Sequence, residues 1–134
     1  MNAIRELSLT FAAGVLGGLV NSAALWAVGQ LGLTAALGVK IAPAFTLVWL
    51  YPRLVWGGIW GLLFLLPFLR RGSIFWAGLL ASLAPSAVQL FYIFPQVAHK
   101  GPAGLELGLM TPLVVIAVNA VWGWAAAAWL RAAR

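Results

Sequence analysis

The segment LMTPLVVIAVNAVWGWAAAAWL, residues 109–130, contains no charged side chain, and Arg131 follows it directly. A helix needs about 20 mostly apolar residues to cross the hydrocarbon core of a bilayer, so this segment is long enough to span it. Three further apolar segments with few charges lie at residues 7–31, 52–69 and 74–94. The pattern predicts an all-α integral membrane protein in which residues 1–134 form one transmembrane domain, a compact bundle of four helices.

The composition agrees with this prediction and limits the chemistry of the chain. Charged residues make up 7% of the sequence, whereas a soluble domain is usually about a quarter charged. The absence of cysteine excludes disulfides, iron–sulfur clusters and cysteine-based zinc sites. One histidine, His99, and two carboxylates, Glu6 and Glu106, are too few for a metal site or for a catalytic set within one leaflet. We therefore expect no enzymatic activity, no metal and no cofactor.

Residues 32–52 are less regular than the four spans. Gly32, Lys40 and Pro43 interrupt the first part of this segment, and Pro52 ends a second short apolar run. Apolar runs this short are typical of re-entrant or interfacial segments. The alternative is one helix over residues 44–69 that is kinked at Pro52, because membrane helices tolerate proline. The second interpretation is slightly favoured.

The cations predict how the chain is oriented. With four spans, five arginines fall on one side of the membrane, against Lys40, Arg53 and Lys100 on the other. Cytoplasmic loops are enriched in Lys and Arg, so we expect both termini in the cytoplasm and the protein in a bacterial inner membrane. The formal charge of +6 then indicates anionic lipid headgroups, not nucleic acid, as the partner. The cations expected at those headgroups are Arg70, Arg71, Arg131 and Arg134.

The N-terminus admits one other interpretation. Arg5 could be the basic region of a signal peptide, with Ser22-Ala23-Ala24 as its cleavage site. A transmembrane span is favoured because the apolar run continues past residue 24 and because Glu6 is unusual in such a basic region.

Each span carries a stripe of small residues at helical spacing. Lipid tails are as apolar as leucine, so close backbone contact and interhelical hydrogen bonds must hold membrane helices together. The stripes predict contacts within the bundle, or alternatively a face for a homo-oligomer or a larger membrane complex. The residues expected at these contacts are Gly14, Gly18, Gly57, Gly61, Gly78, Ser82 and Gly123.

Four polar residues lie where polarity is costly in a membrane. Asn21 and Asn119 fall inside spans and either join the first span to the fourth or line a polar path, which Gln89 in the third span could extend. Arg53 begins the second span directly after Pro52, and three roles are open for it. It could extend toward the headgroups, pair with Glu106, or attract an anion.

Two functions of different class fit these observations. The favoured one is a non-catalytic helix-packing or accessory subunit that associates with itself or with a larger membrane complex. The alternative is an oligomeric channel or transporter for an anion or small polar solute, with Arg53 at its outer-side polar site. A gap in packing beside Arg53 would favour the alternative, and a closed bundle with an exposed small-residue face would favour the subunit. No span contains a carboxylate, which weighs against a proton-coupled exporter.

Overall fold

The computed structural model describes residues 2–134, and it is 80% helix with no strand among those residues. Four helices are long and apolar enough to cross a membrane, which confirms the all-α class and the number of long apolar segments. These are α1 (Ala3–Gln30), α3 (Leu47–Gly61, extended by the 3-10 turn Leu62–Leu65), α4 (Ile74–Val88, extended by the π-helix Gln89–Val97) and α5 (Thr111–Ala133).

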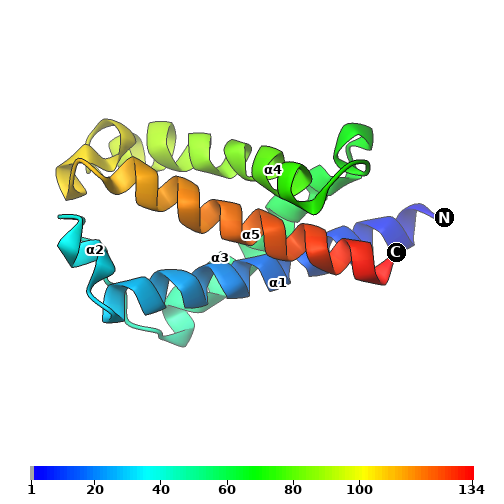
Figure 1. Ribbon diagram of the computed structural model, residues 1–134, viewed down its shortest axis with the longest axis horizontal. Coiled ribbons are helices and arrows are strands. Elements are labelled where there is room, and N and C mark those ends of the chain that lie inside the picture. The colour runs from blue at the N-terminus through cyan, green and yellow to red at the C-terminus, as the bar shows by residue number, and fades with distance from the viewer. Residues whose placement is uncertain (1) are drawn as a thin grey trace.

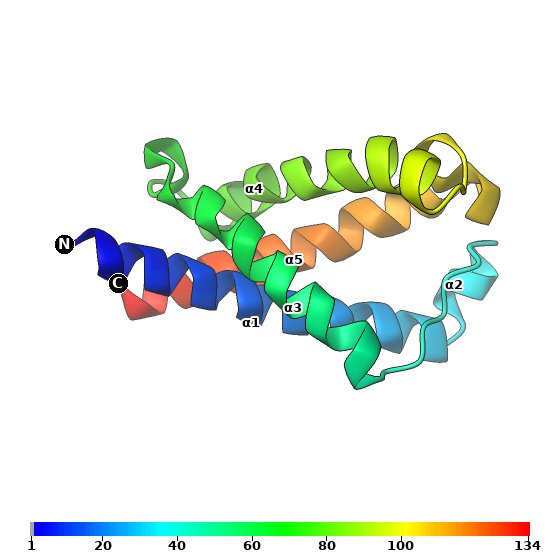
Figure 2. The same cartoon turned by 180° about the vertical axis from the view of Figure 1, so that it is seen from behind.

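The four long helices are arranged around the pair formed by α1 and α5. Helix α1 packs against both α3 and α5, and α4 packs against α5. Helices α3 and α4 make almost no contact with each other: they approach at the end where residues 62–73 connect them and diverge toward the other end (Figures 1 and 2). Both chain ends lie together at the same end as this connection (Figure 1). The bundle therefore has an open side between α3 and α4.

The irregular segment is shorter than expected, and the helix that follows it contains the proline. A short helix, α2 (Leu33–Ala36), lies between Gly32 and Gly38, which both have positive φ. Helix α3 begins at Leu47 because the Thr46 side chain accepts a hydrogen bond from the backbone N–H of Trp49 at 3.2 Å. Pro52 lies inside this helix, so the geometry is closer to the kinked-helix interpretation, although the helix starts three residues later than residue 44.

Residues 38–42 close one end of the bundle. The backbone N–H of Lys40 donates to the carbonyl of Leu107 at 2.8 Å. Val39 is only 3% exposed and packs against Val114 and Val118 of α5. This segment, which we call the strap (residues 38–42), therefore lies over the ends of the helices, beside the turn Pro102–Leu107.

The small-residue stripes lie at contacts inside the molecule. A Cβ added to Gly14 would lie 2.2 Å from the carbonyl oxygen of Gly57 and 2.8 Å from the Cα of Gly61. On the other pair of helices, a Cβ on Gly78 would lie 2.7 Å from the carbonyl carbon of Gly123. Only glycine allows backbones to approach this closely. Ser82 of α4 is 1% exposed, so this stripe is covered within the bundle as well.

Candidate functional site

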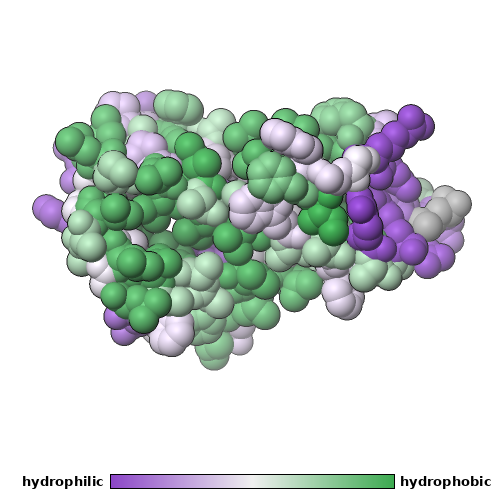
Figure 3. All heavy atoms as spheres, viewed as in Figure 1, coloured by the Kyte–Doolittle hydropathy of each residue, from purple (hydrophilic) through white to green (hydrophobic). Residues whose placement is uncertain are grey.

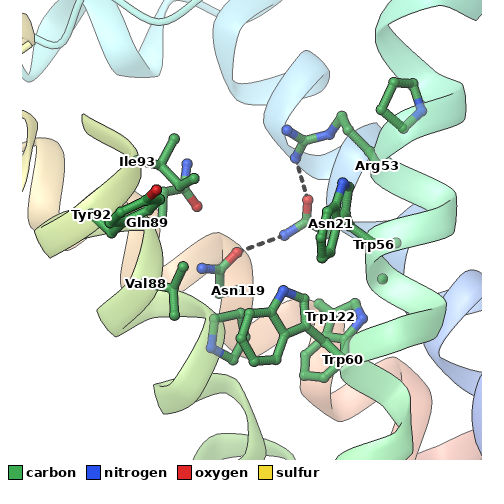
Figure 4. Close-up of a pocket in the computed structure, with 14 residues that line it drawn as sticks. Asn21, Arg53, Trp56, Trp60, Val88, Gln89, Tyr92, Ile93, Asn119 and Trp122 are labelled. Atoms are coloured by element: carbon green, nitrogen blue, oxygen red, sulfur yellow. Dashed lines mark hydrogen bonds between the residues drawn. The ribbon is translucent and has the colours of Figure 1, made fainter. Parts of the chain in front are cut away.

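A cavity of about 500 Å³ opens between α3 and α4, with α1 and α5 forming its floor (Figure 4). It lies at the level where α3 and α4 have begun to diverge. Most of its lining is apolar, and the polar side chains come from all four long helices. The labelled residues that surround it are Asn21, Arg53, Trp56, Trp60, Val88, Gln89, Tyr92, Ile93, Asn119 and Trp122.

Arg53 is held by α1, not by the loop that contains Glu106. Its Nε–H donates to the Ser22 hydroxyl at 2.8 Å, and its Nη2 donates to Oδ1 of Asn21. The guanidinium also lies over the ring of Trp49, with its Cζ 4.7 Å from the ring centroid. The predicted pair with Glu106 is wrong, since Glu106 is exposed in the turn Pro102–Leu107 and makes no ion pair in the described part of the chain.

Arg53 bonds to α1 and not to Glu106 because α1 and α3 are in close contact. A Cβ on Gly18 would lie 2.9 Å from the carbonyl oxygen of Arg53, so the two backbones nearly touch beside this residue. The side chain therefore meets the polar groups one turn further along α1, at Asn21 and Ser22. Ser22 was not predicted from the sequence as a partner of Arg53. Its position next to Asn21, four residues after Gly18, was the available signal.

A chain of hydrogen bonds continues from Arg53 across the bundle. The Asn21 amide donates to the carbonyl of Val118 at 2.8 Å and to Oδ1 of Asn119 at 3.2 Å. The Asn119 amide donates in turn to the Ser86 hydroxyl at 3.1 Å. This polar network joins α3, α1, α5 and α4 in that order (Figure 4 shows its central part). Its side chains are Arg53, Ser22, Asn21, Asn119 and Ser86.

The network uses part of the hydrogen-bonding capacity of Arg53, but it does not neutralise the charge of the guanidinium. A guanidinium has five N–H donors, of which two are used by Ser22 and Asn21, leaving three. No carboxylate in residues 2–134 lies within ion-pairing distance of it. Gln89 faces the cavity from the opposite wall, and its side chain makes no hydrogen bond with the residues the structure describes (Figure 4). The cavity therefore has an unneutralised cation and a free amide on facing walls.

The wall on the α4 side has unusual backbone geometry. Pro85 lies inside α4 and lacks an N–H donor, and four residues later the α-helix gives way to a π-helix that begins at Gln89. The backbone N–H of Ala98 bonds to the carbonyl of Ile93, five residues earlier, at 2.8 Å. π-Helical turns occur frequently at functional sites. Gln89 and Tyr92, which both line the cavity, belong to this π-helix.

Aromatic side chains make up the rest of the cavity wall. Trp122 is buried, and its Nε1–H donates to the carbonyl of Gly14 at 3.1 Å, which fixes the floor. Trp56 and Tyr92 stand on opposite sides of the opening and are 59% and 58% exposed. A second cavity of about 180 Å³ shares Arg53, Gln89 and Asn119 with the first and extends toward Ile41 and Pro43 beside the strap. Arg53 therefore borders both cavities.

A second charged cluster lies at the opposite end of the bundle. The Glu6 side chain is almost fully buried, and its Oε2 accepts from Arg70 at 2.8 Å and from Arg134 at 3.0 Å. Arg134 also donates to the carbonyl of Phe64 at 3.3 Å. Arg70 and Arg134 were assigned to lipid headgroups, but both are turned toward Glu6, because the chain ends and the α3–α4 connection meet at this end. This Glu6 cluster (Glu6, Arg70 and Arg134) was not predicted from the sequence, although the predicted four-span topology places all three residues on the same side of the membrane.

No group of three or more histidine or acidic residues that could hold a metal ion is present in residues 2–134. Comparison with known proteins found no matching family model, no matching curated protein and no matching solved structure. The fold and the cavity together define an all-helical protein with four membrane-length apolar helices and a cationic cavity between two of them.

Proposed function

We propose that this chain is an integral membrane protein that binds an anionic molecule beside Arg53, as a binding or transport component without catalytic activity. The observation that carries the proposal is the unneutralised guanidinium, which has free N–H donors and faces a cavity of about 500 Å³. Cavities of about 300–1,000 Å³ are typical of small-molecule sites, and such sites combine apolar walls with a few placed polar groups.

Several features support insertion in a bilayer with both termini in the cytoplasm. The surface in Figure 3 is mostly hydrophobic along the body, and hydrophilic atoms gather at the end that holds the termini. Arg5, Arg70, Arg71 and Arg131 belong to this end by topology, as the positive-inside rule requires of a cytoplasmic side. Arg53 then lies in the outer half of the membrane. A bacterial inner membrane is the location we propose.

The energetic cost of Arg53 supports a functional role for it. It is three residues from the centre of the Leu47–Leu65 helix, about 4.5 Å at 1.5 Å per residue. An arginine near the centre of a membrane helix costs about 2.5–3.5 kcal/mol on insertion scales. Ser22 and Asn21 provide hydrogen bonds but no negative charge. A bound anion would therefore offset the cost of placing an unpaired charge in the membrane, which these two side chains do not offset.

A helix-packing or accessory subunit is the second candidate function. The polar network favours it, because hydrogen bonds that join four helices are useful in a purely structural protein. The glycine stripes give it less support. Their closest contacts lie within the molecule, between α1 and α3 and between α4 and α5, so these faces are not free for a partner protein. The cavity, which a purely structural bundle does not need, makes anion binding the better supported of the two.

Thermal unfolding in a mild detergent tests the proposal. Apparent melting temperatures are compared in acetate, inorganic phosphate, dodecanoate and dodecyl phosphate at constant ionic strength, with dodecyltrimethylammonium as the cationic reference. A ligand at 100 times its Kd stabilises a protein by about 2.7 kcal/mol, so at least one anion should raise the melting temperature of the wild type clearly.

Two variants assign the effect to the cavity. Arg53→Gln should lose the stabilisation by anions, whereas Arg71→Gln, which removes an exposed cation outside the cavity, should keep it. If no anion stabilises the wild type, or if both variants respond like the wild type, the proposed function is wrong.

A further inference from the structure

We infer that the ligand of this cavity is a lipid-like amphipath, with one anionic headgroup and an apolar chain, that enters sideways from the bilayer between α3 and α4. The inference rests on the proposed anion site and names the class of molecule that fits it. Three features carry it: the direction in which the cavity opens, the contacts that narrow both ends of the bundle, and the separation of polar and apolar groups along the cavity walls.

The cavity opens on the flank of the bundle. Helices α3 and α4 pack on α1 and α5 but scarcely touch each other (Figure 2). Trp56 on α3 and Tyr92 on α4 border the gap, and each is more than half exposed. Trp56 lies at the centre of its membrane-length helix, and Tyr92 lies five residues inside the end of its own, so the surface they border would face lipid. A molecule dissolved in the bilayer can reach Arg53 through this gap without crossing water.

Contacts narrow both ends of the bundle, and the cavity beside the strap at the outer end has less than half the volume of the cavity on the flank. At the outer end the strap is hydrogen-bonded to Leu107, and a Cβ on Gly108 would lie 2.2 Å from the carbonyl oxygen of Gly38. At the other end Phe64 is 1% exposed and packs with Trp122, their ring centroids 6.0 Å apart. A water-soluble ion would have to enter past one of these sets of contacts. The flank is therefore the favourable route, and it selects a ligand that dissolves in lipid.

The groups along the cavity walls are arranged for an amphipath. The polar groups, Arg53, Asn21, Asn119 and Gln89, gather at one level, and the indoles of Trp56 and Trp60 continue along α3 away from them (Figure 4). A small hydrated anion would leave the indole surface wet, and a neutral lipid would leave the charge of Arg53 uncompensated. A single anionic head joined to an apolar chain satisfies both parts.

The headgroup is a carboxylate or a phosphate monoester, because both match a guanidinium fork with two parallel hydrogen bonds. The free N–H donors of Arg53 include both on Nη1 and one on Nη2, so adjacent nitrogens can offer a donor each. The Gln89 amide, on the facing wall, is an uncommitted donor that can complete the site. Dodecanoate and dodecyl phosphate therefore serve as the two probes, and their relative affinity distinguishes the two headgroups.

Tryptophan quenching by brominated probes tests the inference. The full-length protein in phosphatidylcholine nanodiscs is titrated with 12-bromododecanoate and 12-bromododecyl phosphate, with 12-bromododecanol as the neutral reference. We expect saturable quenching by at least one anion and only weak, non-saturating quenching by the alcohol. Trp56→Phe and Trp60→Phe should lower the quenching amplitude. Trp129→Phe, which removes an exposed indole of α5 outside the cavity, should leave the saturable part unchanged.

Variants of Arg53 complete the test. Arg53→Gln should raise the apparent Kd of the brominated anion at least about tenfold. Arg53→Lys keeps the charge and loses the fork, so it should bind with intermediate affinity and serves as the check if the glutamine variant folds poorly. Elution volume and far-ultraviolet circular dichroism establish that each variant is folded.

The outcomes separate this inference from the proposed function. If acetate or inorganic phosphate stabilises the wild type through Arg53 while the brominated anions do not quench, the anion site stands and the lipid-like ligand is wrong. If no anion acts through Arg53 in either experiment, both are wrong. Saturable quenching by the alcohol that is equal in the wild type and in Arg53→Gln would show an apolar groove without a headgroup site, and would also overturn the inference.

Discussion

Arg53 is a cation whose surroundings provide hydrogen bonds without charge. Ser22 and Asn21 hold its position, and Trp49 covers one face of it. Such an arrangement orients a guanidinium and leaves it available to a ligand. A buried carboxylate would have neutralised it instead, as Glu6 does for Arg70 and Arg134 at the other end of the bundle. Arginine therefore has different roles in the cavity and in the Glu6 cluster, and each role can be tested by a single substitution.

Asn21 is the centre of the polar network, so replacing it should lower the free energy of unfolding. Asn21→Leu removes two donated hydrogen bonds and the acceptor of Arg53 Nη2. Interhelical hydrogen bonds in membranes average about 0.6 kcal/mol, and bonds to charged groups reach about 1.5–3 kcal/mol. We expect a loss of about 1–3 kcal/mol in the free energy of unfolding, measured by denaturant titration in detergent. Gln96→Leu, at an exposed position outside the network, is the matched control, and an equal loss there would contradict the role of Asn21.

The two glutamates should differ sharply in their contribution to stability. Glu6→Gln leaves Arg70 and Arg134 without a counter-charge, and Arg70 is partly exposed, so we expect a loss of about 1–3 kcal/mol, below the full cost of a broken buried pair. Glu106→Gln changes an exposed side chain that makes no ion pair within residues 2–134, and it should cost about 0.5 kcal/mol or less. Denaturant titration of both variants checks this, and the reverse order would show that the Glu6 cluster is not stabilising.

At the scale of the helices, the α1–α3 contact depends on glycine backbones that nearly touch. A Cβ on Gly57 would lie 2.7 Å from the carbonyl oxygen of Gly14, and one on Gly61 would lie 2.4 Å from that of Thr10. Backbone atoms cannot move aside as the end of a flexible side chain can. The same contact positions Arg53 against α1, so the close approach of α1 and α3 determines both the helix packing and the position of Arg53 in the cavity.

Gly61→Ala should therefore separate α1 from α3. Overpacking of a close contact costs about 1–3 kcal/mol, and we expect a loss of that size together with weaker anion binding. Val55→Leu adds a methylene on the exposed side of the same helix and should leave both quantities nearly unchanged. Melting temperature and anion titration are measured on both variants. A neutral Gly61→Ala would mean that the helices do not approach as closely as the structure has them.

The helices were predictable from the sequence to a greater extent than the site. Apolar length and the scarcity of charge indicated four long segments, and the glycine spacing indicated the faces that the structure brings together. The start of α3 at Leu47 was not predictable, because it depends on the Thr46 cap and on the strap folding back toward Leu107. The π-helix from Gln89 was not predictable either, since Pro85 by itself is compatible with a simple kink.

At the scale of the whole molecule, the partner of each charge depends on contacts that no local pattern contains. The pairing of Arg53 with Glu106 followed from opposite charge and a shared side of the membrane. It was wrong because α1 lies closer to Arg53 and offers Ser22 and Asn21. Glu6 was overlooked as a partner because it is more than sixty residues from Arg70 in sequence, although the topology brings both to one end.

The topology itself is open to a direct check. Four spans with both chain ends together place residues 70–73 and 131–134 on one side and the turn at residues 98–108 on the other. We expect reporter fusions after Arg71 and after Arg134 to read cytoplasmic, and a fusion after Lys100 to read external. An external reading at Arg134 with a cytoplasmic one at Arg71 would require an odd number of spans between them and would contradict the proposed insertion.

Binding of an anion at Arg53 is the central claim, and native mass spectrometry after equilibration with dodecanoate and dodecyl phosphate measures it most directly. The wild type and Arg71→Gln should each retain one anionic adduct when released gently from detergent, and Arg53→Gln should retain none under the same conditions. Equal adducts on the wild type and on Arg53→Gln, or no adduct on the wild type with either anion, would contradict the claim.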